Sequence, residues 1–298
     1  MEIKINNQPL DVTLENEKTL GEVISGLEAW LDDANLIVCS AHAGADDILS
    51  SQGWESLPVE SIDVLYLTVT QADDLLKENL HTVEQFLTLL KTALADADPS
   101  RIADLLSGIP YLAESVRRQF STDLRSDLER LLTMLADTDA AAIAAWPPPV
   151  REEALRLITV LSERTARRIK ELEEPEAVLR ELASELDRYV EKLGEVSILM
   201  QTGRDRDAMD TVIGFSDLSG RLARVIAYTR SIRSSGEGGE LLIPEGKNLQ
   251  AFYADLNKQL EELVEAFQNR DSVLIGDLLE YEIAPRLKTL KSLVQELI

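Results

Sequence analysis

The hydrophobic pattern of this chain changes its period once, close to residue 71. Before that point apolar and polar residues alternate, as in Glu2–Ile5 and Ile62–Thr70, which is the period of strands with one buried face. From Ala72 onward apolar residues recur every three to four positions, which is the period of amphipathic helices. We therefore predict an α+β fold, with a small strand-containing domain at residues 1–71 and a large all-α domain at residues 72–298.

The net charge of the chain restricts its partners. The sequence carries a formal charge of −24, and residues 1–70 hold thirteen acidic residues against two lysines and no arginine. A surface of this sign repels nucleic-acid phosphates and anionic lipids, so we expect no nucleic-acid partner. Solubility explains the charge more simply than an acidic docking surface does, and both interpretations stay open here.

The sequence shows no segment that would direct the chain into or across a membrane. No apolar stretch approaches the roughly 18 residues that a membrane-spanning helix needs. The start, Met1–Lys4, lacks the basic and apolar regions of a signal peptide. Cys39 is the only cysteine, so an internal disulfide cannot form. We therefore expect a cytoplasmic protein without membrane insertion.

Residues 1–71 contain signals for several strands and one helix. Asn6–Gln8 can turn between two strands, because asparagine tolerates a positive φ. Thr19 and Glu22 have the spacing of a capping box at the start of a helix. Leu36–His42 is apolar enough for a central strand, and Trp54–Ser61 is predicted as a turn or short helix before the last strand.

This order of elements resembles a known fold. The opening Met1–Gln8, the helix start Thr19–Val23 and the run through Val38, Gly44 and Trp54 are similar to the β-grasp or ubiquitin-like fold, most of all to the small sulfur carriers of thiamine and molybdopterin synthesis. Those carriers act through a free C-terminal Gly-Gly. Here the chain continues past Thr70 into a helix, and Gly238-Gly239 lies far downstream. The resemblance therefore implies a β-grasp-like interaction module and argues against sulfur transfer.

A short acidic motif recurs in the helical domain and marks its joints. Each copy predicts the end of one helix, a tight turn and the start of the next. The copies are Leu94–Ala103, Leu135–Ala144, Gln201–Met209 and Phe267–Ile275. We predict that Asp98, Asp139 and Asp271 cap the helices that follow, because aspartate is a favoured N-cap. The irregular spacing favours antiparallel helical hairpins, in a bundle or an elongated array, over a regular solenoid.

The Asp-x-Asp pairs within this motif resemble part of a calcium-binding loop. An EF-hand loop needs glycine at its sixth position and glutamate at its twelfth. Counted from Asp96, these positions hold Arg101 and Ser107; counted from Asp205, the sixth position holds Asp210. Helix capping is therefore the preferred interpretation of these aspartates.

Glycine and proline predict where the helices are interrupted. Gly108–Pro110 should break one helix, which we expect to resume over Tyr111–Leu135. Trp146–Pro149 contains three consecutive prolines, and we predict an extended connector and a subdomain break at residues 146–149. Pro175 permits a helix to restart, and Pro285 predicts a kink in the last helix.

One stretch has a heptad pattern. Its apolar residues are spaced alternately three and four positions apart: Leu179, Leu182, Leu186, Tyr189, Leu193, Val196 and Met200. Such a seam serves either a helix packed within its own chain or a coiled coil between two copies. We prefer packing within the chain because the seam is short, and we keep a homodimer through this seam as the alternative.

A basic face stands out against the acidic background. Arg221, Arg224 and Tyr228 share one face at helical spacing. Pairing of the arginines with nearby carboxylates is the preferred interpretation. The alternative is a docking site for an acidic partner, such as the acidic N-terminal domain.

The sequence contains no complete catalytic or metal-binding motif. Gly214–Leu218 lacks the second glycine of a nucleophile elbow, and Cys39 is expected to be a core residue. A helical di-iron site needs two Glu-x-x-His pairs, whereas Glu78–His81 is the only match. We therefore predict no catalytic, cofactor-binding or metal-binding residue.

These observations favour a non-enzymatic protein. We expect an adaptor or scaffold that binds other proteins, including a second copy of itself if the heptad seam is exposed. The alternative is a carboxylate-rich helical-bundle protein that binds a metal or acts as an enzyme.

Overall fold

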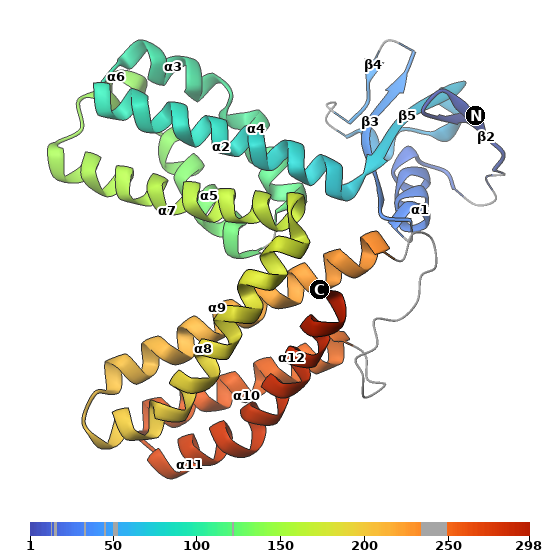
Figure 1. The fold of residues 1–298 in the computed structure, drawn as a ribbon. Coiled ribbons are helices and arrows are strands. Elements are labelled where there is room, and N and C mark those ends of the chain that lie inside the picture. The colour runs from blue at the N-terminus through green and yellow to red at the C-terminus, as the bar shows by residue number, and fades with distance from the viewer. Residues whose placement is uncertain are drawn as a thin grey trace. The chain divides into compact units, whose positions relative to one another are not determined.

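The computed structural model describes residues 1–12, 14, 17–32, 34–44, 46–49, 53–120, 122–233 and 249–298. The fold is α+β, with a sheet near the N-terminus followed by a large helical part (Figure 1). The chain divides into two compact units, Met1–Ile169 and Lys170–Ile298. Gly238-Gly239, whose position argued against sulfur transfer, lies outside the described residues.

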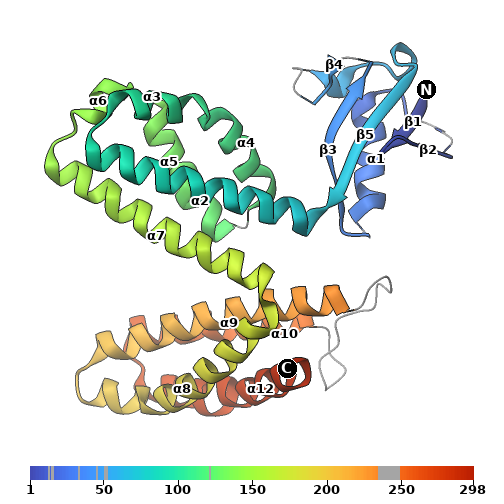
Figure 2. The same cartoon turned by 45° about the horizontal axis from the view of Figure 1, so that its top comes forward.

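The first unit begins with a mixed sheet. Its strands are β1 (Glu2–Ile5), β2 (Gln8–Leu10), β3 (Leu36–Ala43), β4 (Asp46–Asp47) and β5 (Val64–Gln71). Their order is β2-β1-β5-β3-β4, with β1 parallel to β5 and the other pairs antiparallel. Helix α1 (Leu20–Asp32) covers one face (Figure 2). The short helices η1 (Trp54–Ser56) and η2 (Val59–Ser61) precede β5, as the sequence predicted.

Two predictions of local structure in this unit, the turn at Asn6–Gln8 and the capping box at Thr19, are confirmed. Asn6 and Asn7 adopt positive φ values of 49° and 67° in the turn between β1 and β2. The Thr19 hydroxyl accepts from the Glu22 N–H at 3.3 Å, while the Glu22 carboxylate accepts from the Thr19 N–H at 3.1 Å. These reciprocal bonds are a capping box. The backbone N–H groups of Lys18 and Thr19 both donate to the Glu22 carboxylate and lower the pKa of Glu22.

Asn6 also has a role that the sequence did not suggest. Its amide nitrogen donates to the Val69 carbonyl at 2.9 Å, and its amide oxygen accepts from the Val69 N–H at 3.0 Å. The side chain therefore continues the β1–β5 pairing by one residue beyond Ile5. At the end of β5, Ala72 donates to the Asn35 carbonyl, and the Asn35 side chain donates to Asp73. The chain thus passes from sheet to helix without a linker.

The helices of the first unit follow directly. They are α2 (Ala72–Asp96), α3 (Pro99–Ser107), α4 (Ile109–Gln119), α5 (Thr122–Ala136), α6 (Ala140–Ala144) and α7 (Pro148–Glu173), which continues into the second unit. The break at Gly108 is confirmed.

Two predicted boundaries in this unit are wrong. The helix expected over Tyr111–Leu135 is interrupted at Phe120, which adopts an extended conformation and buries its ring. The predicted connector at Trp146–Pro149 is shorter, because Pro148 and Pro149 form the first turn of α7. Proline lacks only an N–H that is unpaired in a first turn, and its fixed φ suits a helix.

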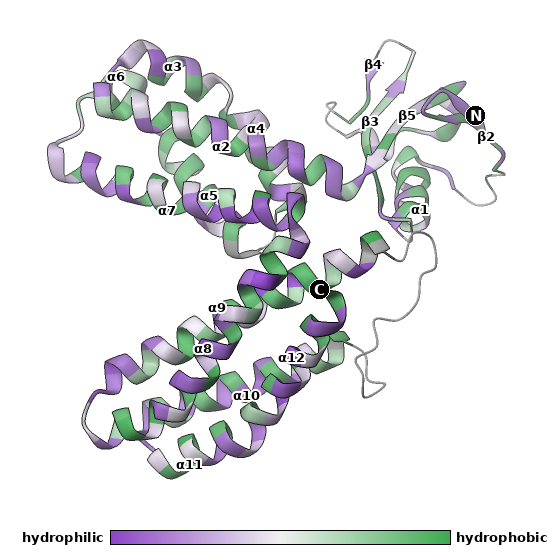
Figure 3. Cartoon of the chain, viewed as in Figure 1, coloured by the Kyte–Doolittle hydropathy of each residue, from purple (hydrophilic) through white to green (hydrophobic). Residues whose placement is uncertain are grey.

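The second unit contains α8 (Pro175–Gln201), α9 (Asp205–Arg233), α10 (Leu249–Asn269), α11 (Ser272–Asp277), the π-helical segment η3 (Leu278–Ile283) and α12 (Ala284–Leu297). These helices surround one apolar core and form a bundle. Hydrophobic and hydrophilic residues alternate along them, as amphipathic packing requires (Figure 3). The restart at Pro175 is confirmed. Near Pro285, where we predicted a kink, the π-helical segment η3 ends at Ile283 and Pro285 lies in the first turn of α12.

The recurring acidic motif forms joints with a shared geometry. Ala97 ends α2 with φ 51°, and the Asp98 N–H donates to the Ala93 carbonyl at 3.1 Å. Arg270 ends α10 with φ 53°, and the Asp271 N–H donates to the Ala266 carbonyl at 3.0 Å. In both joints a left-handed residue closes one helix, and the next residue starts another. This is the Schellman arrangement of a helix end.

The aspartates of these joints cap the following helices, as predicted. Asp98 accepts from the Ser100 N–H at 3.0 Å, Asp139 from the Ala142 N–H at 2.9 Å and Asp271 from the Leu274 N–H at 3.0 Å. The joint before α9 differs. There the left-handed residue is Gly203, and Asp207 accepts from the Arg204 side chain and does not cap.

The left-handed joint residues give a paired stability prediction for the second unit. Arg270→Gly should raise the free energy of unfolding by about 0.5–1 kcal/mol, because a side chain is strained at positive φ. Gly203→Ala should lower it by about 1 kcal/mol for the same reason, since an added Cβ would meet no neighbour within 4 Å. Urea denaturation of the full chain followed by circular dichroism measures both changes. Shifts of the same sign in the two variants would contradict this account.

Candidate partner-binding surfaces

The heptad seam lies inside the second unit. Leu179, Leu182, Leu186, Leu193 and Val196 are buried in its core, and Tyr189 and Met200 are half-buried against it. The seam faces the other helices of the same bundle, chiefly α9, which runs beside α8 (Figure 1). Packing within the chain therefore accounts for the seam, and these side chains present no uncovered stripe to a second copy.

Gly214 explains how the aromatic member of the seam is accommodated. A Cβ at this position of α9 would lie well inside contact distance of the Tyr189 hydroxyl. The missing side chain therefore makes room for the tyrosine, whose ring also contacts Phe215 at 6.4 Å between centroids. The glycine that the sequence analysis weighed as part of a nucleophile elbow is thus a packing residue.

This contact predicts a specific rescue. Gly214→Ala should lower the free energy of unfolding by about 1–3 kcal/mol through overpacking, although alanine is the better helix former. Combining it with Tyr189→Phe should recover part of the loss, because the clashing hydroxyl is gone. Thermal and urea unfolding of the two single variants and the double variant measure the coupling. Additive losses in the double variant would show that the two positions do not interact.

The predicted basic face is occupied by carboxylates of neighbouring helices. Arg221 Nε lies 3.2 Å from one oxygen of Glu171, and Arg224 Nε lies 3.4 Å from the other. Arg221 also reaches Glu185 at 3.5 Å. Glu171 of α7 is only 1% exposed, and Tyr228 is buried on α9, the helix that carries both arginines. The pairing of arginines with nearby carboxylates, which we preferred from the sequence, is what the structure shows, and it ties the end of α7 to α8 and α9.

The shared carboxylate should be critical for stability. Glu171→Ala leaves two arginines without their common partner, so we expect a loss of about 2–4 kcal/mol in the free energy of unfolding. Glu185→Ala removes a more exposed carboxylate from the same network and should cost less than about 1 kcal/mol. Urea denaturation of each variant measures the difference. Equal and small losses in both variants would contradict a structural role for Glu171.

The residues considered for chemistry do not come together. His81 lies 3.6 Å from Glu84 on the surface of α2. Among the residues that the structure describes, no three His, Cys, Asp or Glu side chains are grouped closely enough to hold a metal ion. Cys39 is half-buried in β3, and burial raises the pKa of its thiol, so little reactive thiolate forms at neutral pH.

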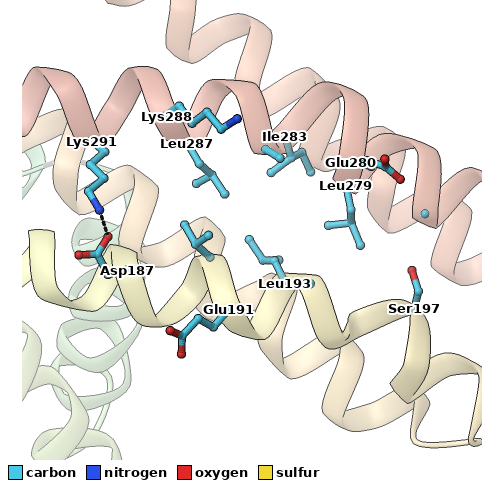
Figure 4. Close-up of a pocket in the computed structure, with 14 residues that line it drawn as sticks. Asp187, Glu191, Leu193, Ser197, Leu279, Glu280, Ile283, Leu287, Lys288 and Lys291 are labelled. Carbon is cyan, nitrogen blue, oxygen red and sulfur yellow. Dashed lines mark hydrogen bonds and ion pairs between the residues drawn. The ribbon is translucent and has the colours of Figure 1, made fainter.

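A groove on the second unit was not found from the sequence. It lies between α8 on one side and η3 with α12 on the other, and its volume is about 790 Å³. Figure 4 shows Leu193, Leu279 and Leu287 pointing between the two walls. The floor between the two walls is thus mainly apolar, and charged residues lie at the rim.

Two contacts bound the groove along its length. At one end the Lys291 ammonium lies 2.6 Å from the Asp187 carboxylate and joins the two walls (Figure 4). At the other end Gly276 comes so close to α8 that an added Cβ would lie 3.6 Å from the Ser197 hydroxyl. Asp187 and Ser197 are ten residues apart on one helix, which corresponds to about 15 Å.

Gly194 lines the groove between these two ends. It lies in the interior of α8, where glycine costs about 1 kcal/mol relative to alanine. Apart from its chain neighbours and the nearby backbone of α8, an added Cβ at Gly194 would meet no atom of the described residues within 4 Å. Packing within the described structure therefore does not require a glycine there, in contrast to Gly214.

Exposed apolar side chains continue the groove beyond its floor. Val190 lines it and is 45% exposed, and Ile198 is 60% exposed. Both lie four residues from Gly194, so they extend the same face of α8. On the opposite wall, Val273 is exposed three residues before Gly276. The opposite wall also contains the π-helical turn, a feature that occurs frequently at functional sites.

The rim of the groove carries several charged side chains. Asp187 and Lys291 are paired with each other, whereas Glu191 on α8, Glu280 on η3 and Lys288 on α12 form no ion pair with any residue that the structure describes. The uncompensated rim is therefore acidic, with carboxylates on both walls.

The sequence contains a signal for one wall of this groove. Gly194 interrupts a stretch of residues that otherwise favour a helix. Val190 and Ile198 are apolar but lie outside the heptad seam. The facing wall could not be located without the fold, because η3 and α12 are about a hundred residues downstream.

The described part of the chain contains no helix that is long and apolar enough to cross a bilayer. No solved structure matches this chain.

Family comparisons match both ends of the chain. Residues 1–71 match the family described as the TP0873 N-terminal domain, and residues 177–293 match a domain of unknown function, DUF8042. The second match includes every residue that lines the groove. The chain is also 32% identical over 114 residues to an uncharacterized protein of Treponema pallidum (strain Nichols). That alignment covers 38% of this chain and 55% of the relative, so the chain spans about half of the relative's length.

Proposed function

We propose that this protein is a non-enzymatic adaptor or scaffold that binds another protein in the groove between α8 and η3–α12. The observation that carries the proposal is that Gly194, in the middle of α8, lines a groove flanked by exposed apolar side chains. The groove distinguishes it from Gly26 of α1, another helix-interior glycine whose added Cβ would meet nothing within 4 Å. A residue that weakens its own helix, as a glycine in a helix interior does, and that gains no packing in return is expected at functional sites.

The exposed apolar residues around the groove support the same function. Val190 and Ile198 on α8 and Val273 on α11 remain uncovered, and apolar surface rimmed by polar residues is typical of protein-binding sites. The walls supply no group of metal ligands or paired catalytic side chains among the described residues. A binding role therefore fits this site better than catalysis.

The N-terminal domain would supply a second binding surface. We infer that its five-stranded sheet and single helix form a β-grasp-like module, on the resemblance of residues 1–71. Trp30 on α1 is 58% exposed, and tryptophan is enriched where proteins meet. Binding surfaces in two separate units are what an adaptor requires.

Site-specific photocrosslinking tests the proposed function. A photoreactive phenylalanine analogue replaces Val190 or Ile198 in the full chain, expressed in its native host. Ile213 on α9 is the matched control, because it is 57% exposed and does not line the groove. We expect discrete protein adducts from positions 190 and 198 that are missing at position 213.

A variant that fills the groove tests whether the adducts depend on it. Gly194→Phe places a ring into the groove, and its Cβ has no neighbour to displace. The adducts at position 198 should disappear in this background and persist in Gly194→Ala. Adducts of equal strength at all three positions, or none at positions 190 and 198, would refute the groove as a protein-binding site.

A further inference from the structure

The shape of the groove fits a helix of a partner. Its length of about 15 Å corresponds to about three helical turns, over which an amphipathic helix presents apolar residues at positions i, i+3 or i+4, and i+7. The small residues Gly194 and Ala284 line opposite walls, so the backbone of a third helix can approach both. Ile198 and Val273 then extend the contact past the Ser197–Gly276 end.

An extended peptide fits this surface less well. Strand addition requires a wall with free backbone N–H and C=O groups, as at the edge of a sheet. Both walls here are helices, whose backbone groups bond within the same helix. Contacts in the groove must therefore come from side chains, and a helix presents those along one face.

The charge of the rim specifies the flanks of that helix. Glu191 and Glu280 lie on opposite walls and have no ion-pair partner within the described ranges of the chain, and Lys288 is the one unpaired cation among the described lining residues. The whole chain adds a formal charge of −24, which attracts a basic partner and repels an acidic one. A second copy of this chain would bring the same negative charge to the contact.

We infer that the groove binds an amphipathic helix of a partner protein, with an apolar face that covers the exposed Val190, Ile198 and Val273 and with basic residues flanking that face. This inference rests on the proposed function and adds the chemical class of the partner. The basic flanks pair with Glu191 on one wall and with Glu280 on the other.

Synthetic peptides test this inference on the purified full-length protein. The first probe is a fluorescent helical peptide of about 18 residues, long enough for stable turns, with leucines at i, i+3, i+4 and i+7 and lysines on both flanks. The second has the same composition in scrambled order, and the third carries glutamates in place of the lysines. Fluorescence anisotropy should show binding of the first probe, no binding of the scrambled probe, and at least about tenfold weaker binding of the acidic probe.

Variants locate the binding and test the charges. Gly194→Phe should abolish binding of the basic probe, and the control Gly194→Ala should retain it. The double variant Glu191→Lys, Glu280→Lys should bind the basic probe about tenfold more weakly and the acidic probe more tightly than the unmodified protein does. Circular dichroism confirms that each variant is folded. Equal binding of the basic and acidic probes, or binding unaffected by Gly194→Phe, would overturn the inference.

Two further measurements distinguish other occupants. Binding of oleate that is lost in Gly194→Phe, without binding of the basic peptide, would assign the groove to a small amphiphile and overturn the inference. Self-association by light scattering that is lost in the same variant would assign it to a second copy. Crosslinked adducts at Val190 together with failure of the basic peptide would refute this partner class alone, whereas absence of adducts would refute the proposed function.

Discussion

The second unit depends on the packing of α8, which has partners on two sides. One side carries the heptad seam into the bundle core, where Tyr189 fits over Gly214 of α9. The other side forms one wall of the groove, opposite η3 and α12. The seam packs α8 into the core, and Arg221, which also pairs with Glu171, binds Glu185 of α8. Because these contacts hold α8 in place, its outer side can stay open without loss of the fold. A binding surface is best supported by a rigid element of this kind.

The joints between helices follow one physical rule with local variations. A residue at positive φ ends a helix, and an aspartate one position later caps the next, as at Ala97–Asp98 and Arg270–Asp271. The acidic motif is therefore a device for turning the chain. The carboxylates of Asp98, Asp139 and Asp271 accept from backbone N–H groups, whereas Asp96 and Asp207 accept from the arginine side chains of Arg101 and Arg204.

Much of the fold could be predicted from local chemistry, and the site could not. The change of period near Gln71, the capping box at Thr19 and the N-cap at Asp98 depend on neighbouring residues, so the sequence contains their signals. Phe120 ends a helix without a glycine or proline because its ring is buried, which is a tertiary effect. The groove pairs α8 with η3–α12, and only the fold brings those distant segments together.

The two glycines at positions 194 and 214 separate structure from function in this bundle. Both interrupt helices at a similar local cost. At Gly214 the cost is offset, because Tyr189 occupies the space and joins the core. At Gly194 no neighbouring helix of the described structure occupies the space, although alanine is the better helix former. Under the proposed function a partner fills this space, and the apolar residues and carboxylates around Gly194 set the chemistry of that partner.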